Sequence, residues 1–441
     1  MARAEPAEPG AAGGDYAARH LRWNFTVLLA DAASFYLGLA LFDGATVLPV
    51  LLARLGATDT LVGMVRLLQT LGFTLPALVA AHIIHGRAYH KRYLLWCCAG
   101  ARIGLPVLPF LLLTSATSRP GVVMAALLVI IGVFWLLDGA CAVSWFEIVA
   151  KSIPARVRGR FFGGMQTLGG LVGMCSGAIV ASVLGSRSLP YPADFAFLAA
   201  GWCVGAWMSQ VFLTLIREPV SHAVADDERP AFRDFLRSAV PLIRDNPRLA
   251  RLVLARVALD GAGLAGPFYV LYAQRDLVAP VAAVGLYALA RSLGKVCTGP
   301  VWGWCSDRFG PANGLRLVAW AVVAVPALAL ASTPDTRWLL FVAFFLQGAV
   351  EDGVWMICST TLFESVAPHQ RPLAVGVATV FQTPSALYGP IGGVISQRLG
   401  YRAAFTVALL IGVAGALLAA RIRQAPAAAL TGADDGASQL A

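Results

Sequence analysis

The sequence predicts an all-α integral membrane protein, with twelve transmembrane helices in two pseudo-symmetric six-helix bundles. Three observations predict this fold class: an excess of apolar residues, twelve apolar segments of membrane-spanning length, and a pattern that recurs in both halves. Of the 441 residues, 58% are hydrophobic and 13% are charged, whereas soluble domains contain about 45–50% and about 25%. So few charges would not cover the surface of a soluble protein of this size, which excludes a soluble fold.

A helix needs roughly 20 apolar residues to cross the hydrocarbon core of a bilayer. The chain contains twelve such segments, six before and six after a polar stretch near its middle. The predicted segments are 24–51, 61–84, 93–113, 121–150, 162–184, 195–215, 252–272, 281–304, 315–331, 338–363, 373–395 and 405–420.

The segments divide the chain into two bundles, one polar linker between them and two terminal tails. Residues 23–217 form the predicted N-terminal bundle and residues 251–423 the C-terminal bundle. Residues 1–22 and 424–441 are predicted to be disordered tails. The linker 218–250 carries apolar residues near helical spacing beside arginines, which predicts an amphipathic helix on the membrane surface, with a solvated linker as the alternative. The apolar residues concerned are Phe232, Phe235, Leu236, Leu242 and Ile243.

The distribution of basic residues predicts the orientation. The chain has 34 Lys and Arg residues, and most of those outside the apolar segments fall on the side of both termini. By the positive-inside rule, both termini are cytoplasmic in a multi-pass cell-membrane protein, which we expect to be a bacterial inner-membrane protein. The net charge of +10 therefore faces lipid headgroups and cytosol, and we expect no nucleic-acid partner.

Two motifs recur in the halves. Trp135-Leu-Leu-Asp138-Gly-Ala matches Phe344-Phe-Leu-Gln-Gly-Ala in the second half. The loop after segment 281–304 contains Gly303, Asp307, Arg308 and Gly310, spaced as G-x-x-x-D-R-x-G, and the loop after segment 61–84 contains a degraded copy around His85 and Arg87.

This loop motif, placed between the eighth and ninth segments of twelve, resembles the signature of the major facilitator superfamily. The resemblance implies two bundles around a central cavity, alternating access by rocking, and a latch on the cytoplasmic side. His85 stands where the family has Asp, so the first-half latch is expected to be weak or pH-sensitive. We assign no subfamily, because Trp135 replaces an arginine common in proton-coupled members and the Gly-Pro signature of drug antiporters is absent. The expected gate residues are His85, Arg87, Glu147, Arg158, Gly303, Asp307, Arg308, Gly310, Glu364 and Arg371.

Charged side chains inside the segments fall mainly in the first, second, fourth, seventh, eighth and tenth, while the third contributes Arg102. A charge within a span normally faces a protein cavity, so we expect these residues to converge on a polar pathway. The alternative, ion pairs that only hold the bundles together, stays open for an Asp43–Arg66 pair. Asp138 is a candidate proton carrier, because it lacks a basic neighbour in apolar surroundings. The pathway candidates are Asp43, Arg66, Asp138, Asp260, Arg291, Lys295, Glu351 and Asp352.

Aromatic and amide side chains are weaker candidates for the cavity wall, since most aromatics in membrane proteins face lipid. Gly261, Gly263, Gly266 and Pro267 follow Asp260 and predict a broken seventh helix. The candidate lining residues are Trp145, Gln166, Tyr269, Tyr287, Trp355, Gln382 and Tyr388.

These features predict a secondary active transporter for a small polar or amphiphilic solute, coupled to a proton or ion gradient and monomeric in the lipid membrane. No P-loop, nucleophile–base pair or set of metal ligands is apparent, so we expect no enzyme activity, no cofactor and no metal. A proton-coupled efflux pump for drug-like cations is one alternative. A receptor or scaffold with this fold but without transport is another.

Overall fold

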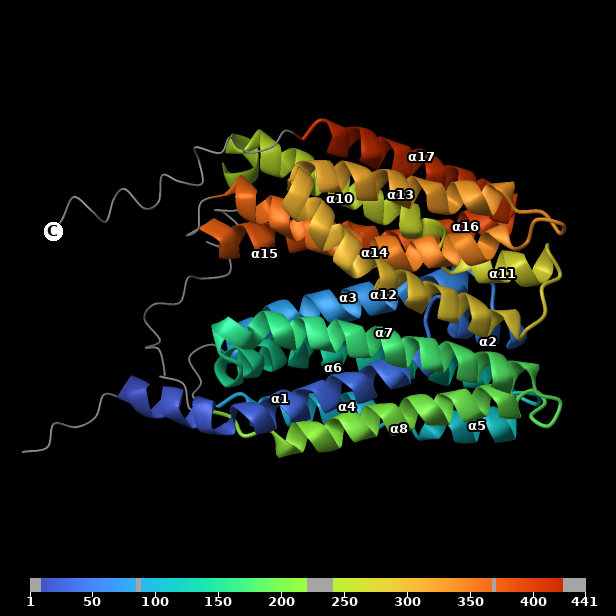
Figure 1. Ribbon diagram of the computed structural model, residues 1–441. Helices are drawn as coiled ribbons and strands as arrows, with labels where there is room; N and C mark the ends of the chain where they lie inside the picture. The colour runs from blue at the N-terminus through green and yellow to red at the C-terminus, as the bar shows by residue number, and fades with distance from the viewer. Residues whose placement is uncertain (1–8, 85–88, 220–240, 367–369, 423–441) are drawn as a thin grey trace, which may run out of the picture.

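The computed structural model describes residues 9–84, 89–219, 241–366 and 370–422, and every regular element in these ranges is a helix. The helices form two elongated bundles that lie side by side (Figure 1). The N-terminal bundle contains α1 (Pro9–Leu41), α2 (Val47–Arg54), α3 (Asp59–Ile84), α4 (Lys91–Arg102), α5 (Val107–Ser115), α6 (Pro120–Ser152), α7 (Ala155–Gly185) and α8 (Ala193–Leu215). The C-terminal bundle contains α10 (Pro247–Ala262), η2 (Gly263–Ala265), α11 (Phe268–Arg275), α12 (Ala283–Phe309), α13 (Pro311–Ala331), α14 (Leu339–Ser365), α15 (Arg371–Gln382), η4 (Thr383–Leu387), α16 (Tyr388–Leu399) and α17 (Tyr401–Ala420).

Helices occupy all twelve predicted segments. Among the described residues, eight helices or helix pairs are long and apolar enough to cross a membrane. The remaining four segments contain α3, α10 with α11, α12, and α15 with α16, and they are either charged or interrupted. The chain is thus a multi-pass membrane protein.

The ends of the bundles serve as a frame of reference. We call the end at which α1 begins and α17 finishes the terminus side, and the opposite end, where α2, α5 and α11 lie, the far side (Figure 1). Helix α3 begins at the far side and α7 finishes there, while α12 begins there and α16 finishes there.

The first predicted span is interrupted at an acidic residue. Helix α1 ends at Leu41 and α2 begins at Val47. In the turn between them, the Asp43 carboxylate accepts hydrogen bonds from the Ala45 amide at 3.0 Å and from the Thr46 hydroxyl at 2.8 Å. A short acidic side chain that bonds the backbone of its own turn competes with the helix, which explains the break.

The predicted break in the seventh helix is confirmed. Helix α10 ends at Ala262, a single 3-10 turn follows, and α11 begins at Phe268 directly after Pro267. Glycines in the turn and a proline that cannot donate a backbone hydrogen bond account for the interruption. The eleventh segment is interrupted in the same way by η4, which contains Pro384.

Two predictions about the connections need adjustment. Helix α1 already begins at Pro9, so the segment predicted to be disordered is helical from there, in keeping with its high alanine content. Of the amphipathic linker helix, Phe232, Phe235 and Leu236 lie outside the described residues. Residues 241–245 are helical, and Leu242 and Ile243 pack, half-buried, against the C-terminal core.

The packing repeats between the halves as the sequence does. A β-carbon at Gly139 of α6 would collide with the carbonyl oxygen of Phe73 on α3, and one at Gly348 of α14 would collide with that of Arg291 on α12. Small residues let membrane helices approach at backbone distance. The two glycines occupy matching positions of the repeated motif, so the duplication sets how each bundle packs internally.

Candidate transport pathway

Two helix pairs join the bundles, α3 with α16 and α7 with α12, and both contacts are built on glycine. A β-carbon at Gly63 would collide with the backbone of Gly389, and one at Gly177 would lie 2.6 Å from the Leu289 amide nitrogen. Of these glycine contacts, the one nearest the terminus side packs Gly170 against Val296, at the middle of α7 and α12. The close approach therefore covers the middle and the far side of the interface.

Polar contacts hold the bundles together at the far side. The Arg275 guanidinium donates to the Asp59 carboxylate at 2.9 Å and also bonds the Tyr401 hydroxyl. The Thr60 hydroxyl donates to the Gln397 side-chain oxygen at 2.7 Å. We call the three residues Asp59, Arg275 and Tyr401 the far-side clasp.

A second set of charges spans the interface deeper in the molecule. Arg291 of α12 donates through Nη1 to Asp43 at 2.7 Å and through Nη2 to Glu351 at 2.7 Å. Lys295 lies 3.2 Å from Glu351 and 3.9 Å from Asp352. We call these five residues the charge chain. Asp43 therefore pairs with Arg291, because α1 ends against α12, and the Asp43–Arg66 pair considered from the sequence does not form.

On the terminus side, the ion pairs between described residues stay within one bundle. Glu218, 3% exposed, accepts the backbone amides of His90 and Lys91 at 2.8 and 2.9 Å, and the Lys151 ammonium lies 3.4 Å away. In the C-terminal bundle, Arg248 pairs with Glu364 at 3.3 Å. Neither set crosses the interface.

The predicted gate residues form no latch across the interface in the part of the chain that the structure describes. Asp307 and Arg308 are exposed, and Gly310 ends α12 with a positive φ of 81° that favours glycine. Arg158 donates to the carbonyl oxygens of Ala150 and Ile153 within its own bundle, and Gly303 has open space around it. Glu147 is exposed.

Three gate predictions involve undescribed groups. His85 and Arg87 lie outside the described residues, and of Arg371 only the backbone, at the start of α15, is described. Glu364 bonds Arg248. The latch at these positions stays a prediction.

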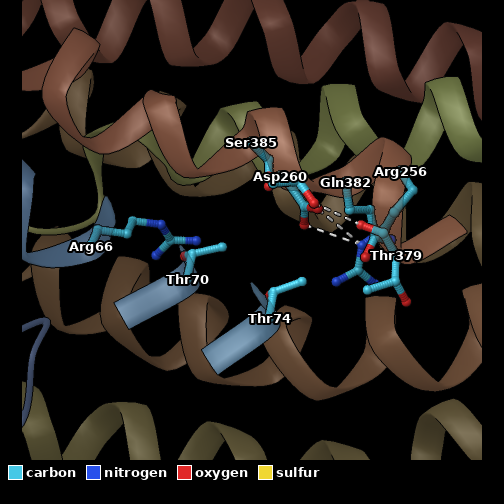
Figure 2. A pocket seen from close by; sticks show the side chains of 9 residues that line it. Arg66, Thr70, Thr74, Arg256, Asp260, Thr379, Gln382 and Ser385 are labelled. Atoms are coloured by element: carbon cyan, nitrogen blue, oxygen red, sulfur yellow. Dashed lines mark hydrogen bonds and ion pairs between the residues drawn. The ribbon is translucent and has the colours of Figure 1, made fainter. Parts of the chain in front are cut away.

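A cavity of about 210 Å³ lies between the bundles, next to the broken seventh helix. The α3 residues Arg66, Thr70 and Thr74 face it from one bundle and Asp260 with its neighbours from the other (Figure 2). Within it, Arg256 Nε donates to both carboxylate oxygens of Asp260, at 3.1 and 3.3 Å. The lining residues are Arg66, Thr70, Thr74, Arg256, Asp260, Thr379, Gln382, Thr383 and Ser385.

The predicted lining residues divide between cavity, core and surface. Gln382 lines the cavity, as predicted. Tyr269 and Tyr287 do not, since they are 2% and 1% exposed and pack on Phe344 inside the C-terminal bundle. Their large aromatic rings fill the core between α11, α12 and α14, which corrects the prediction.

The other four lie elsewhere. Trp145 donates to Asp31 at 3.0 Å within the N-terminal bundle. Gln166 and Trp355 are exposed on α7 and α14, and Tyr388 contacts the α10 backbone near Gly261. None of these four lines the described cavity.

Asp138 belongs to a different environment from the other charged candidates. It lies on α6 beside Cys141, whose thiol donates to the Asp138 backbone carbonyl at 3.1 Å. Nearby, the Ser209 hydroxyl links Asp31 at 2.6 Å to Arg102 at 2.9 Å. This polar network is internal to the N-terminal bundle, and its role in proton transfer stays a prediction.

Sequence reasoning missed all of the Thr and Ser residues in the cavity wall and also missed Arg256. A signal was present for both. Arg66, Thr70 and Thr74 recur every four residues and so share one face of α3. Arg256 precedes Asp260 by four residues, the spacing of an intrahelical ion pair.

Comparisons with known proteins agree with this architecture. Residues 252–439 match the family model of the Major Facilitator Superfamily. The match to this family model covers most of the second half of the chain. No curated protein matches the sequence.

Solved transporter structures share this fold at low sequence identity. An inward-facing bacterial homologue of the iron transporter ferroportin is 13% identical, with 90% of this chain and 98% of that chain covered and a TM-score of 0.68. A D-xylose–proton symporter is 14% identical, with 91% and 99% covered and a TM-score of 0.64. An outward-facing bacterial ferroportin homologue with soaked iron is 14% identical, with 90% of this chain and 98% of that chain covered and a TM-score of 0.58.

Proposed function

We propose that this chain is a secondary active transporter that moves a small polar solute across the membrane by alternating access. One observation carries the proposal: a polar cavity is lined by both bundles, and the polar bonds between the bundles, among the described residues, lie in the middle and at the far side. The family and fold, which are those of transporters, support it. With the terminus side cytoplasmic, the structure corresponds to an inward-facing state.

Similarity to other structures supports this assignment of state. The TM-score is 0.68 with the inward-facing ferroportin homologue and 0.58 with the outward-facing one. Both comparisons cover 90% of this chain, so the difference reflects the arrangement of the helices and not the length compared.

The charge chain is the proposed site of coupling to a proton or cation gradient. Its carboxylates Asp43, Glu351 and Asp352 outnumber its cations Arg291 and Lys295. Asp352 makes the longest of these contacts, at 3.9 Å to Lys295, and so forms the weakest ion pair of the three carboxylates. A surplus carboxylate at an interface that must open is suited to binding a proton or cation.

The two alternatives receive less support. An exporter of amphiphilic cations would need aromatic surfaces and a free carboxylate, whereas the cavity wall has no aromatic residue among the described lining and its Asp260 is paired with Arg256. A receptor without transport does not need to open and close, so it gives no reason for bonds that cross between the bundles at the far side while the described ion pairs on the terminus side stay within one bundle.

Cysteine labelling tests the proposal against a static receptor. In a background without the eight native cysteines, Ser385→Cys places a thiol on the cavity wall and Arg398→Cys places one on the exposed far end of α16. A transporter should allow membrane-impermeant maleimide to reach position 385 from both sides of the membrane and position 398 from one. Labelling of position 385 from one side only, under every gradient and solute, would contradict the proposal.

A further inference from the structure

The cavity wall is unusual for a binding pocket because every described lining residue is polar, while most ligand pockets are lined mainly by apolar side chains. Its volume of about 210 Å³ corresponds to roughly seven water molecules. That is below the range of about 300–1,000 Å³ for drug-sized ligands. The cavity thus has the size and surface of a site for a small, strongly polar solute.

The side chains that line the cavity carry a net charge of one positive unit, from Arg66, Arg256 and Asp260. Arg256 and Asp260 neutralise one another. Arg66 makes no ion pair or hydrogen bond with another described residue, and its Nη2 lies against Gly263, 3.2 Å from the position a β-carbon would take there. Glu351, an acid in its vicinity, already bonds Arg291 and Lys295. The guanidinium of Arg66 is therefore free to bind an anion.

Free hydrogen-bonding groups adjoin this charge. Thr379 and Thr383 donate to carbonyl oxygens one turn earlier, at 2.9 and 3.2 Å, as helical threonines commonly do. In contrast, Thr70, Thr74, Gln382 and Ser385 make no side-chain hydrogen bond to a described residue. Three hydroxyls, two of them one turn apart along α3, and one amide are left in the cavity wall (Figure 2).

We propose that this cavity binds a small hydroxylated monocarboxylate. Arg66 holds the carboxylate through two parallel N–H···O bonds, and Thr70, Thr74 and Gln382 bond the hydroxyl groups of the solute. The inference rests on the proposed function, because it names the class of solute that the pathway carries. It assigns Arg66, Thr70 and Thr74 to recognition of the solute and the Arg256–Asp260 pair to the opposite, neutral wall.

The charge count separates this class from its neighbours. A phosphate monoester carries about −1.5 to −2 at pH 7, more than Arg66 alone compensates. A cation would meet the guanidinium and find no unpaired carboxylate in the wall. A zwitterion would gain from Arg66 but would leave its ammonium group without an acidic partner.

Binding to the purified full-length protein in detergent tests the inference without requiring transport. The probes are matched sets that differ in charge at one end: glycerate, glycerol and 3-amino-1,2-propanediol, then gluconate, sorbitol and glucamine. Serine and glycerol 3-phosphate represent the zwitterion and the phosphate ester. Ligand-induced shifts of the thermal unfolding midpoint, at constant ionic strength, give apparent affinities. At least one carboxylate should bind tenfold or more tightly than its polyol and amine counterparts.

Variants locate the effect. Arg66→Gln should remove the preference for the carboxylate, Arg66→Lys should retain part of it, and Thr70→Val with Thr74→Val should weaken the carboxylate and the polyol alike by several-fold. Arg398→Gln, at the exposed far end of α16, is the matched control and should change nothing. The double threonine variant keeps the test decisive even if Arg66→Gln does not fold.

Several results would overturn the inference: no shift with either carboxylate, tighter binding of an amine, serine or glycerol 3-phosphate, or a carboxylate preference that survives in Arg66→Gln. Its failure is distinguishable from failure of the proposed function. A chain that binds glycerate while position 385 is labelled from one side only is a carboxylate receptor. A chain labelled from both sides that binds none of these carboxylates is a transporter of another solute.

Discussion

The far side and the terminus side of the interface are built from the same kinds of residue, used differently. On the far side, Arg275 pairs with Asp59 of the other bundle. On the terminus side, Arg248 pairs with Glu364 of its own bundle. In the proposed rocking motion, pairs that cross the interface must break, whereas pairs within a bundle move with it as a rigid unit. We therefore expect the interactions that oppose opening to lie at the far side and in the charge chain.

The crossing pairs also differ in burial, which ranks their energies. The Arg291 and Asp43 side chains are 17% and 18% exposed, while the Arg275 side chain is 44% exposed. A pair screened by water contributes about 0–1 kcal/mol, whereas removing one partner of a buried pair costs roughly 3–5 kcal/mol. The charge chain should therefore matter more than the clasp.

The largest effect is expected from Arg291→Gln. The substitution leaves Asp43 without a cation in a mostly buried position, so we expect transport to be lost and the free energy of unfolding to fall by roughly 3–5 kcal/mol. Thermal denaturation in detergent measures the change. The double variant Arg291→Gln with Asp43→Asn should recover part of the stability, and a single variant as stable as the parent would refute the ranking.

Gly63→Ala should separate the bundles at the far side. Its methyl group would collide with the backbone of Gly389, and overpacking of this kind costs about 1–3 kcal/mol. The state that is closed at the far side should lose population, so far-side labelling of Ser385→Cys should accelerate tenfold or more. Gly121→Ala, where nothing lies within 4 Å, is the control. Equal labelling rates in the two variants would show that the glycine contact does not hold the far side closed.

Asp59→Asn opens the clasp without changing its shape. Because Arg275 is substantially exposed, we expect at most about 1 kcal/mol, which corresponds to a roughly fivefold faster far-side labelling of Ser385→Cys. Arg398→Gln, which removes a far-side charge outside the clasp, should leave the rate as it is. If the two variants behave alike, the ion pair contributes nothing specific to closure.

The smallest effect is expected from Arg248→Gln. Its pair with Glu364 lies within the C-terminal bundle at 3.3 Å, with both side chains partly exposed, so stability should fall by about 0.2–1 kcal/mol. Labelling of Ser385→Cys from either side should stay within twofold of the parent. A marked change in sidedness would mean that terminus-side pairs also control the state.

The sequence predicted helices wherever a single physical signal decided the outcome. Apolar length located all twelve segments, and glycines followed by Pro267 located the break in the seventh helix. The break at Asp43 was missed, because the apolar residues continue past it while the carboxylate bonds its own turn.

The site was predicted less completely, for reasons of geometry. The charges of α12 and α14 were correctly expected to lie together, but which acid meets Arg291 depends on where α1 ends against α12. Tyr269 was placed in the cavity because aromatic residues suit binding sites, yet its direction depends on the turn of α11 after η2, which turns it into the core. Composition shows which groups a helix carries, and tertiary packing decides which way they point.

Distances between spin labels on the two bundles measure whether the bundles rock about the cavity. One pair, Thr58→Cys with Arg398→Cys, spans the far side, and another, Arg160→Cys with Arg308→Cys, spans the terminus side, all at exposed positions. If the bundles rock about the cavity, Gly63→Ala should lengthen the far-side distance and shorten the terminus-side distance at the same time. Far-side and terminus-side distances that stay fixed, or that lengthen in parallel, would contradict alternating access about the cavity.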